Sequence, residues 1–152
     1  MMVALMWDDG ADQSVPLPAY QTKGAAGADM RANFGMGGGS KTLAPGERAL
    51  IPTGLRMAIP DGMEVQIRPR SGLALKNGIT MINAPGTIDC DYRGPVGVLV
   101  VNLGHAAFEI THGMRIAQMV LAPVVQAQFA IVDSLENTTR GTGGFGSTGV
   151  VT

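Results

Sequence analysis

The sequence is poor in cysteine, in charged residues and in long apolar runs. One cysteine, Cys90, excludes an intrachain disulfide and leaves too few ligands for a tetrahedral zinc site. Charged residues make up 15% and the formal net charge is −1, so no basic field is present to hold a nucleic-acid backbone. The longest apolar runs, residues 98–101 and 119–125, are too short to span a bilayer. We therefore expect neither a nucleic-acid-binding nor a membrane protein.

The first residues also lack the features of a targeting segment. The chain begins MMVALMWDDG, without a basic leader, and soon meets Asp8 and Asp9. This resembles neither a secretory signal nor an Arg-rich transit peptide. Together with the single cysteine, it predicts a cytoplasmic, reducing location.

Glycine and proline are abundant, at 22 and 9 residues, which favours many tight turns and little helix. Residues 63–68 alternate between apolar and polar, as in a half-buried strand. Residues 96–101 are apolar on both faces, which predicts a central strand buried on both sides. Residues 115–125 form another apolar segment, bent or ended at Pro123. This pattern predicts an all-β barrel or sandwich.

One short segment has helical signals. Residues 71–77 (SGLALKN) begin with Ser71 as an N-cap and end before Gly78, a good C′ residue. From residue 137 the chain becomes small and polar. We predict a β domain over residues 1–136 and a mobile Gly-rich arm over residues 137–152.

An acidic segment, residues 83–94 (NAPGTIDCDYRG), is bounded by turn residues and predicts a β-hairpin with residues 87–92 near its base. On a strand, Asp89 and Asp91 would project to one face. Two neighbouring carboxylates raise the chance that one acts as a base or lies near a cation. The alternative is a solvated acidic edge, and this segment taken alone favours it.

A basic segment, residues 68–72 (RPRSG), places guanidinium groups at a helix start. Free N–H groups and the positive dipole end would join Arg70 in a cradle suited to phosphate. The alternative is that Ser71 only caps the helix. Asp29, on a small apolar strand, needs a partner, either a structural arginine or a hydrated metal ion.

The terminal segment, residues 140–149 (RGTGGFGSTG), formally contains GxGxxG. It is not a dinucleotide fingerprint, because no strand precedes it and too few residues follow for a helix, and no P-loop lysine follows its glycines. The segment could close over a nucleotide, with Phe145 stacking on a base and Arg140, Ser147 and Thr148 meeting phosphate. A disordered linker end is the alternative.

In order, residues 26–32, 68–79, 83–94, 113–118 and 140–149 resemble the five motifs of the trimeric dUTPase family. The resemblance implies a β-barrel or jelly-roll subunit and a homotrimer whose active sites are shared between chains. It also implies hydrolysis of dUTP to dUMP and pyrophosphate, which limits uracil in DNA and supplies dUMP for dTMP synthesis.

The resemblance also implies residue roles. Asp89 would be the general base for water attacking the α-phosphorus. Asp29 would assist Mg²⁺ through a water, with the ion held mainly by substrate phosphates. Phosphates would be held by Arg70, Ser71, Gly72 and Gln118; uracil and deoxyribose by Asn83, Thr87, Ile88, Tyr92 and Gly97; and the lid would use Arg140, Phe145, Gly146, Ser147 and Thr148.

One departure from the family pattern is Met114, where an acid is usual, so that Arg115 is expected to lack its partner. Two other functions fit the same fold: a dCTP deaminase-like enzyme, and a non-catalytic trimeric binding or signalling module. The Ile-Asp-x-Asp-Tyr segment and the Gly-rich arm argue against the first, and retention of Asp89 with that arm argues against the second.

Overall fold

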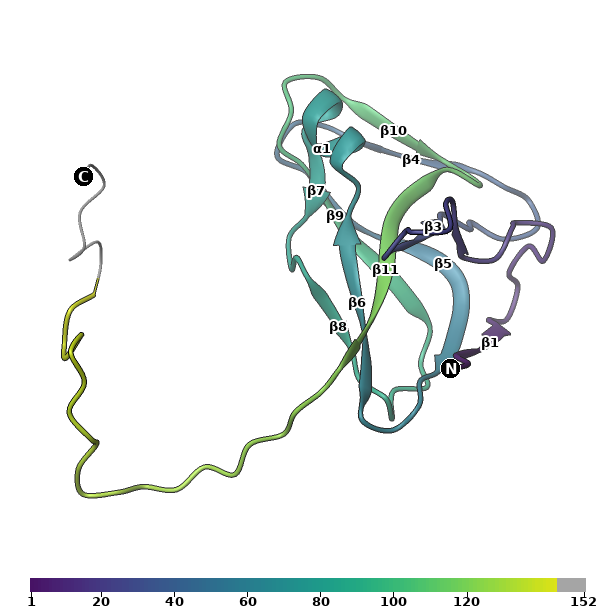
Figure 1. Ribbon diagram of the computed structural model, residues 1–152. Coiled ribbons are helices and arrows are strands. Elements are labelled where there is room, and N and C mark those ends of the chain that lie inside the picture. The colour runs from purple at the N-terminus through teal and green to yellow at the C-terminus, as the bar shows by residue number, and fades with distance from the viewer. Residues whose placement is uncertain (145–152) are drawn as a thin grey trace.

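The computed structural model describes residues 1–144, which form eleven strands and one short helix (Figure 1). The elements are β1 (Ala4–Trp7), β2 (Ala19–Tyr20), β3 (Ala28–Arg31), β4 (Ser40–Leu43), β5 (Arg48–Ala58), β6 (Met63–Pro69), α1 (Ser71–Asn77), β7 (Ile79–Met81), β8 (Gly86–Ile88), β9 (Val96–Asn102), β10 (Phe108–Thr111) and β11 (Arg115–Pro123).

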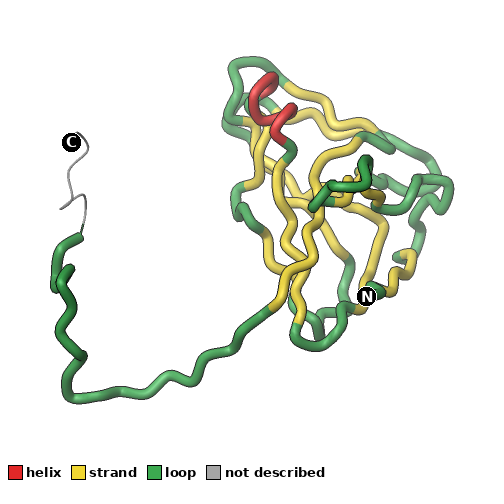
Figure 2. The backbone as a smooth tube through the Cα atoms, viewed as in Figure 1, coloured by secondary structure: helices red, strands yellow, loops and turns green. Residues whose placement is uncertain are grey.

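The strands form three antiparallel sheets that wrap around one core (Figure 2). Their orders are β1-β5-β9-β7, β10-β4 and β2-β3-β11-β6-β8. Thus β9 lies between β5 and β7, and β11 lies between β3 and β6. The predicted all-β barrel with a single short helix is confirmed for the described part of the chain.

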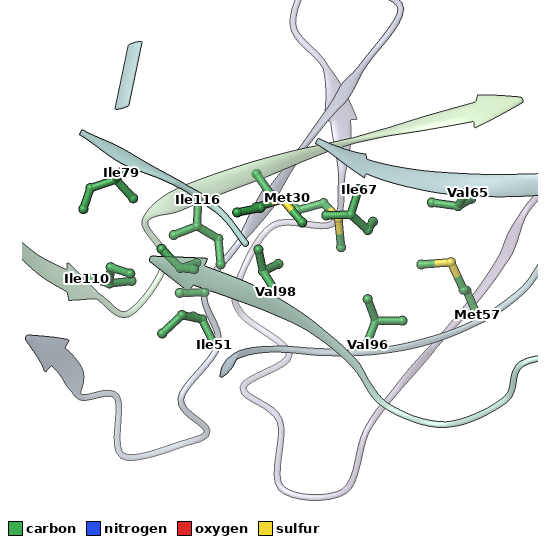
Figure 3. Close-up of a cluster of buried hydrophobic side chains, with 14 of the residues drawn as sticks. Met30, Ile51, Met57, Val65, Ile67, Ile79, Val96, Val98, Ile110 and Ile116 are labelled. Carbon is green, nitrogen blue, oxygen red and sulfur yellow. The ribbon is translucent and has the colours of Figure 1, made fainter. Parts of the chain in front are cut away.

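The core lies between the two larger sheets (Figure 3). The predicted alternation in β6 is confirmed, since Val65 and Ile67 are 0% and 1% exposed while Arg68 is exposed. Val98 of β9 and Ile116 of β11 are buried in the same cluster. Burying every second residue along β5 and β6 fixes the pairing register, because a one-residue slip would turn the core set toward solvent.

The prediction that residues 96–101 are buried on both sides is wrong for the isolated chain. Strand β9 is central, but Leu99 is 37% exposed and its partner on β5, Leu50, is 63% exposed. Their side chains leave the outer face of this sheet apolar and open. Sequence patterning cannot tell a face covered by the same chain from one that another chain would cover.

The helix prediction is correct in extent but wrong in its cap. Arg70, with φ −91° and ψ 126°, is the N-cap and makes no side-chain capping bond, so Ser71 is already the first helical residue. Because Ser71 is inside the helix, its exposed hydroxyl is not the capping group. Gly78 ends the helix in the left-handed region, with φ 68°, as expected.

Strand β11 contains an irregularity that matters for the site. Arg115 pairs with Arg31 and Ala117 pairs with Met30, so Ile116 is an extra residue opposite a single step of β3. Ile116 and Ala117 are therefore buried in succession, while Arg115 and Gln118 on either side face outward. Such a bulge changes the face to which the neighbouring side chains point, and it leaves one residue without a partner in the hydrogen-bond ladder.

After β11 the described chain, residues 124–144, forms neither helix nor strand and runs away from the barrel (Figure 1). The boundary at residue 136 stays a prediction. In the described residues, no helix is long and apolar enough to cross a membrane.

Removing core volume should destabilise this barrel strongly. We expect Ile67→Ala to lower the free energy of unfolding by about 2–5 kcal/mol, because it opens a cavity between the sheets. Denaturant unfolding at one fixed protein concentration measures it. The control Met36→Ala, at a side chain 76% exposed, should stay within about 0.5 kcal/mol of wild type. Equal effects of the two substitutions would contradict this core.

Candidate active site

A carboxylate shared by two arginines lies on the outer face of the β3-β11-β6 sheet. Asp29 Oδ1 accepts from Arg70 Nε at 3.0 Å, and Oδ2 accepts from Arg115 Nη1 at 3.0 Å. The Asp29 side chain is 13% exposed, against 28% for Arg70 and 39% for Arg115. Both guanidiniums thus remain open to solvent, and the cluster carries one positive charge in excess, which suits an anionic ligand.

The start of α1 adds to this cluster. Arg70 directly precedes the first two helical residues, Ser71 and Gly72, both of which are exposed. The Arg70 side chain turns back to Asp29 and also donates from Nη1 to the Arg115 carbonyl oxygen at 3.3 Å. The predicted residues Asp29, Arg70, Ser71 and Gly72 therefore come together.

Gln118 joins the same group through the strand register. It lies directly opposite Asp29 on β3 and Arg68 on β6, and its Nε2 donates to the Pro69 carbonyl oxygen at 3.1 Å. Gln118 and Arg68 also line an open groove of about 420 Å³, whose other wall is the Ala84-Pro85 turn. Gln118 and Arg68 thus lie next to the turn that carries Asn83.

The geometry predicted for the acidic segment is wrong. Strand β8 ends at Ile88, and Asp89 begins a turn closed by the Tyr92 amide, which donates to the Asp89 carbonyl oxygen at 3.2 Å. Asp89 and Asp91 are therefore not successive same-face residues of a strand. Strand β8 pairs with β6 rather than with β7 or β9, so the expected hairpin ladder is also absent from the described residues.

Asp89 itself is exposed and lines a groove of about 530 Å³ with Asp61, Glu64 and Asp91. Tyr92, 43% exposed, is held by its hydroxyl, which donates to the Pro95 carbonyl oxygen at 3.1 Å. The Asp89 carboxylate is thus accessible to a ligand, and Tyr92 lies at the other end of the same turn.

The remaining pocket residues are distributed over two sheets. Thr87 and Ile88 lie on β8, opposite Gln66 and Val65, and the exposed Asn83 lies in the turn before β8. Gly97 lies on β9 in the other sheet, where a Cβ atom would overlap Leu50. The chain alone does not bring Gly97 to β8 by strand pairing.

Strand β6 separates the two halves of the candidate site. Its register with β8 places Asp89 beside Glu64, whereas Arg70 follows the other end of the strand. Six residues at about 3.3 Å each put these groups roughly 20 Å apart. Three linked phosphates cannot bridge that distance within one chain.

The predicted lid is only partly described. Arg140 is exposed, and its Nε donates to the Gly143 carbonyl oxygen at 2.9 Å. It contacts none of the other predicted site residues within the described chain. Phe145, Gly146, Ser147 and Thr148 lie outside the described residues.

The expectation that Arg115 lacks an acidic partner is wrong. Its expected acidic partner at position 114 is Met114, which packs against the core, but Asp29 supplies the carboxylate instead. The sequence offered one signal for this pair: Asp29 on one strand needs a partner, and Arg115 on another strand lacks one. Their pairing depends on the bulge in β11.

Among residues 1–144, no three His, Cys, Asp or Glu side chains are grouped to hold a metal ion. Asp29 is the one acid in the basic cluster, and each of its oxygens already accepts from an arginine. A cation there would depend mainly on ligands brought by the substrate. That arrangement suits an ion that keeps most of its waters, as Mg²⁺ does.

Comparisons with known proteins match this chain to dUTPases over nearly its whole length. The dUTPase family profile matches residues 13–149. The deoxyuridine 5'-triphosphate nucleotidohydrolase of Roseobacter denitrificans is 74% identical over 145 residues, covering 95% of this chain and 94% of that protein. The protein of the same name from Dinoroseobacter shibae is 57% identical over 151 residues, covering 98% and 97%.

The chain belongs to the dUTPase family. The fold agrees with solved dUTPases at low sequence identity. The enzyme of Staphylococcus bacteriophage 80alpha with dUpNHpp matches with a TM-score of 0.84 at 24% identity, over 98% of this chain and 99% of that one. A point mutant of the phage phi11 dUTPase, described with a structural Mg(II) ion, matches with a TM-score of 0.76 at 20% identity, over 90% and 100%.

Gly27 lies close against the Gln118 side chain in this dUTPase-family chain. A Cβ atom at Gly27 would overlap the Gln118 side chain, whereas a Cβ at Gly24 would meet nothing within 4 Å. We expect Gly27→Ala to displace the Gln118 side chain and to lower the unfolding free energy by about 1 kcal/mol, because Gln118 loses its bond to the Pro69 carbonyl oxygen. Gly24→Ala should be neutral or slightly stabilising. Thermal unfolding of both variants measures this, and equal melting temperatures would show that Gly27 does not fix Gln118.

Proposed function

We propose that the protein hydrolyses dUTP to dUMP and pyrophosphate, limiting uracil in DNA and supplying dUMP for dTMP synthesis. The observation that carries the proposal is the presence of both required parts: an accessible carboxylate, Asp89, and an open arginine cluster around Asp29. Relatives named deoxyuridine 5'-triphosphate nucleotidohydrolase, at up to 74% identity among those compared, support the same substrate.

The separation of these parts supports a site shared between copies. Asp89 and Arg70 lie at opposite ends of β6, roughly 20 Å apart, so one nucleotide must use Asp89 of one copy and Arg70 of another. Head-to-tail contacts of this kind close into a ring when the rotation allows. We infer a homotrimer with three such shared sites.

Two apolar surfaces support assembly. Leu50 and Leu99 form an open outer face on the β5-β9 pair. Beyond β11, Val125, Phe129 and Ile131 are 94%, 96% and 103% exposed, in a segment where apolar residues recur every second position. Exposed apolar residues at strand spacing, with no strand beside them in the described chain, are expected to pack against another copy.

The position of Arg140 supports a lid contributed by a neighbour. It follows Pro123 by 140 − 123 = 17 residues, enough for a reach of roughly 55–60 Å when extended. The described part of the arm leaves its own barrel (Figure 1). Arg140, Phe145, Gly146, Ser147 and Thr148 would then cover the bound nucleotide of another copy and exclude bulk water.

In the proposed reaction Asp89 accepts a proton from a water that attacks the α-phosphorus in line with the departing pyrophosphate. The bond from the α-phosphorus to the bridging oxygen breaks, and pyrophosphate takes the electron pair. Arg70, Ser71, Gly72 and Gln118 bind the phosphates and stabilise the charge that develops on their oxygens. Mg²⁺, when bound through the phosphates and a water at Asp29, would neutralise part of the same charge.

Nucleoside recognition is assigned to the turn and strand around Asp89. Asn83 and the backbone near Thr87 and Ile88 would hydrogen-bond uracil, which leaves buried groups unpaired if cytosine enters. Tyr92, fixed by its bond to the Pro95 carbonyl oxygen, would pack on deoxyribose where a ribose hydroxyl would clash. Gly97 keeps its β9 backbone free of side-chain bulk. The cytoplasmic location stays a prediction.

The activity is tested by measuring pyrophosphate release with Mg²⁺ from dUTP, dTTP, dCTP and UTP in parallel. We expect release from dUTP only. Ammonia release from dCTP would support the deaminase-like alternative. Binding of dUTP without turnover would support a non-catalytic module.

Replacing the general base should abolish turnover selectively. We expect Asp89→Asn to lower kcat by about 10²–10⁴-fold with dUTP binding retained, because an amide cannot accept the proton. Asp91→Asn, an exposed acid in the same turn, is the matched control and should stay within about tenfold of wild type. Turnover of Asp89→Asn near the control's value would remove Asp89 from this role.

Deleting residues 140–152 should leave a folded trimer with activity reduced at least about 100-fold, because the site no longer closes over substrate. Size-exclusion chromatography with light scattering measures assembly, and pyrophosphate release measures activity. Deletion of residues 150–152 alone serves as the control. Full activity in the longer deletion would reject the lid.

A further inference from the structure

We infer that Arg115 is a positioning residue that keeps Arg70 available to substrate phosphate by occupying the second oxygen of Asp29. The inference rests on the proposed function and adds a residue to which sequence reasoning gave no role. The Asp29 carboxylate accepts one hydrogen bond from each of two guanidiniums: Oδ1 from Arg70 and Oδ2 from Arg115, each at 3.0 Å.

The division leaves Arg70 with donors to spare. A guanidinium has five N–H groups. Arg70 uses one at Nε for Asp29 and one at Nη1 for the Arg115 carbonyl oxygen, which leaves three for a ligand. Arg70 is therefore held from two sides by Asp29 and the Arg115 backbone, while three of its N–H groups form no hydrogen bond within the described chain and its side chain stays 28% exposed.

Without the Arg115 side chain this arrangement would change. Arginine and carboxylate prefer two parallel hydrogen bonds, and Oδ2 would lose its own partner. The Asp29 carboxylate could then turn and take a second N–H of Arg70. The excess positive charge would also disappear, because one carboxylate would face one guanidinium. Phosphate would have to compete with Asp29 for Arg70.

The β11 bulge indicates that the fold places Arg115 for this contact. Regular alternation would put Arg115 on the same side as the fully buried Ala117. The extra residue, Ile116, turns Arg115 to the outer face instead, beside Gln118, which itself lies opposite Asp29. Bulges recur next to active sites because they re-aim a side chain in this way.

The test compares ligands that differ in the phosphates that Arg70 would bind. Calorimetric titrations with Mg²⁺ use an α,β-imido analogue of dUTP and, separately, dUMP. We expect Arg115→Gln to weaken the analogue about tenfold or more, the size expected for one charge-assisted contact, with dUMP affinity unchanged. Lys41→Gln, which removes a cation paired with Glu47 at 2.8 Å, is the control and should bind both ligands like wild type.

A double-mutant cycle separates action through Arg70 from direct contact. If Arg115 acts through Arg70, then Arg70→Gln/Arg115→Gln binds the analogue no more weakly than Arg70→Gln alone. Additive losses, or wild-type affinity in Arg115→Gln, would overturn the inference while dUTP hydrolysis by the wild type still stood. Absence of wild-type hydrolysis would instead reject the proposed function.

Arg115→Lys keeps the test decisive if Arg115→Gln does not fold. An ammonium group can still occupy Oδ2, although with a single point contact instead of a planar fork, so we expect analogue affinity within about threefold of wild type. A tenfold loss in this variant, at a wild-type melting temperature, would contradict the role assigned to Arg115.

Discussion

The position of β11 between β3 and β6 is the constraint on which the basic half of the site depends. Pairing on both sides sets Asp29, Gln118 and Arg68 in one row across three strands. The row faces outward because the alternate residues Met30, Ala117 and Ile67 are buried. The same hydrophobic register that stabilises the barrel thus fixes Gln118, which is proposed to bind phosphate, opposite Asp29, which orients Arg70.

The length of β6 has the opposite effect on the complete site. It keeps the acidic turn and the arginine cluster at separate ends of one sheet, so Arg70 and Arg115 bond to Asp29 and not to Asp89. In the proposed shared site, assembly would bring Asp89 to a phosphorus held by another copy, and catalysis would then depend on oligomerisation.

The basic cluster shows how one carboxylate can serve two structural purposes. Asp29 orients Arg70 at the helix start and provides the partner that Arg115 lacks at Met114. Since only 13% of its side chain is exposed, these bonds are screened less by solvent than the Lys41–Glu47 pair, whose side chains are 42% and 41% exposed. This chain therefore accommodates Met114 without leaving Arg115 unpaired, because Asp29 on β3 supplies the carboxylate.

The sequence by itself determined the all-β class, the extent of α1 and the alternation of β6, because these follow from local periodicity and turn residues. Its motif order also named the candidate residues, whose roles stay predictions. It did not determine that Arg70 caps the helix, that β8 ends before Asp89, or that Asp29 pairs with Arg115. The two arginine bonds to Asp29 join residues 41 and 86 positions apart, and the bulge that aims Arg115 leaves no local signal. The end of β8 is instead set by a local turn, closed by the bond from the Tyr92 amide to the Asp89 carbonyl oxygen, which the alternation of residues 87–92 does not reveal. The tertiary structure also decided which predicted residues meet within one chain, since strand register and strand length set distances that spacing along the sequence does not encode.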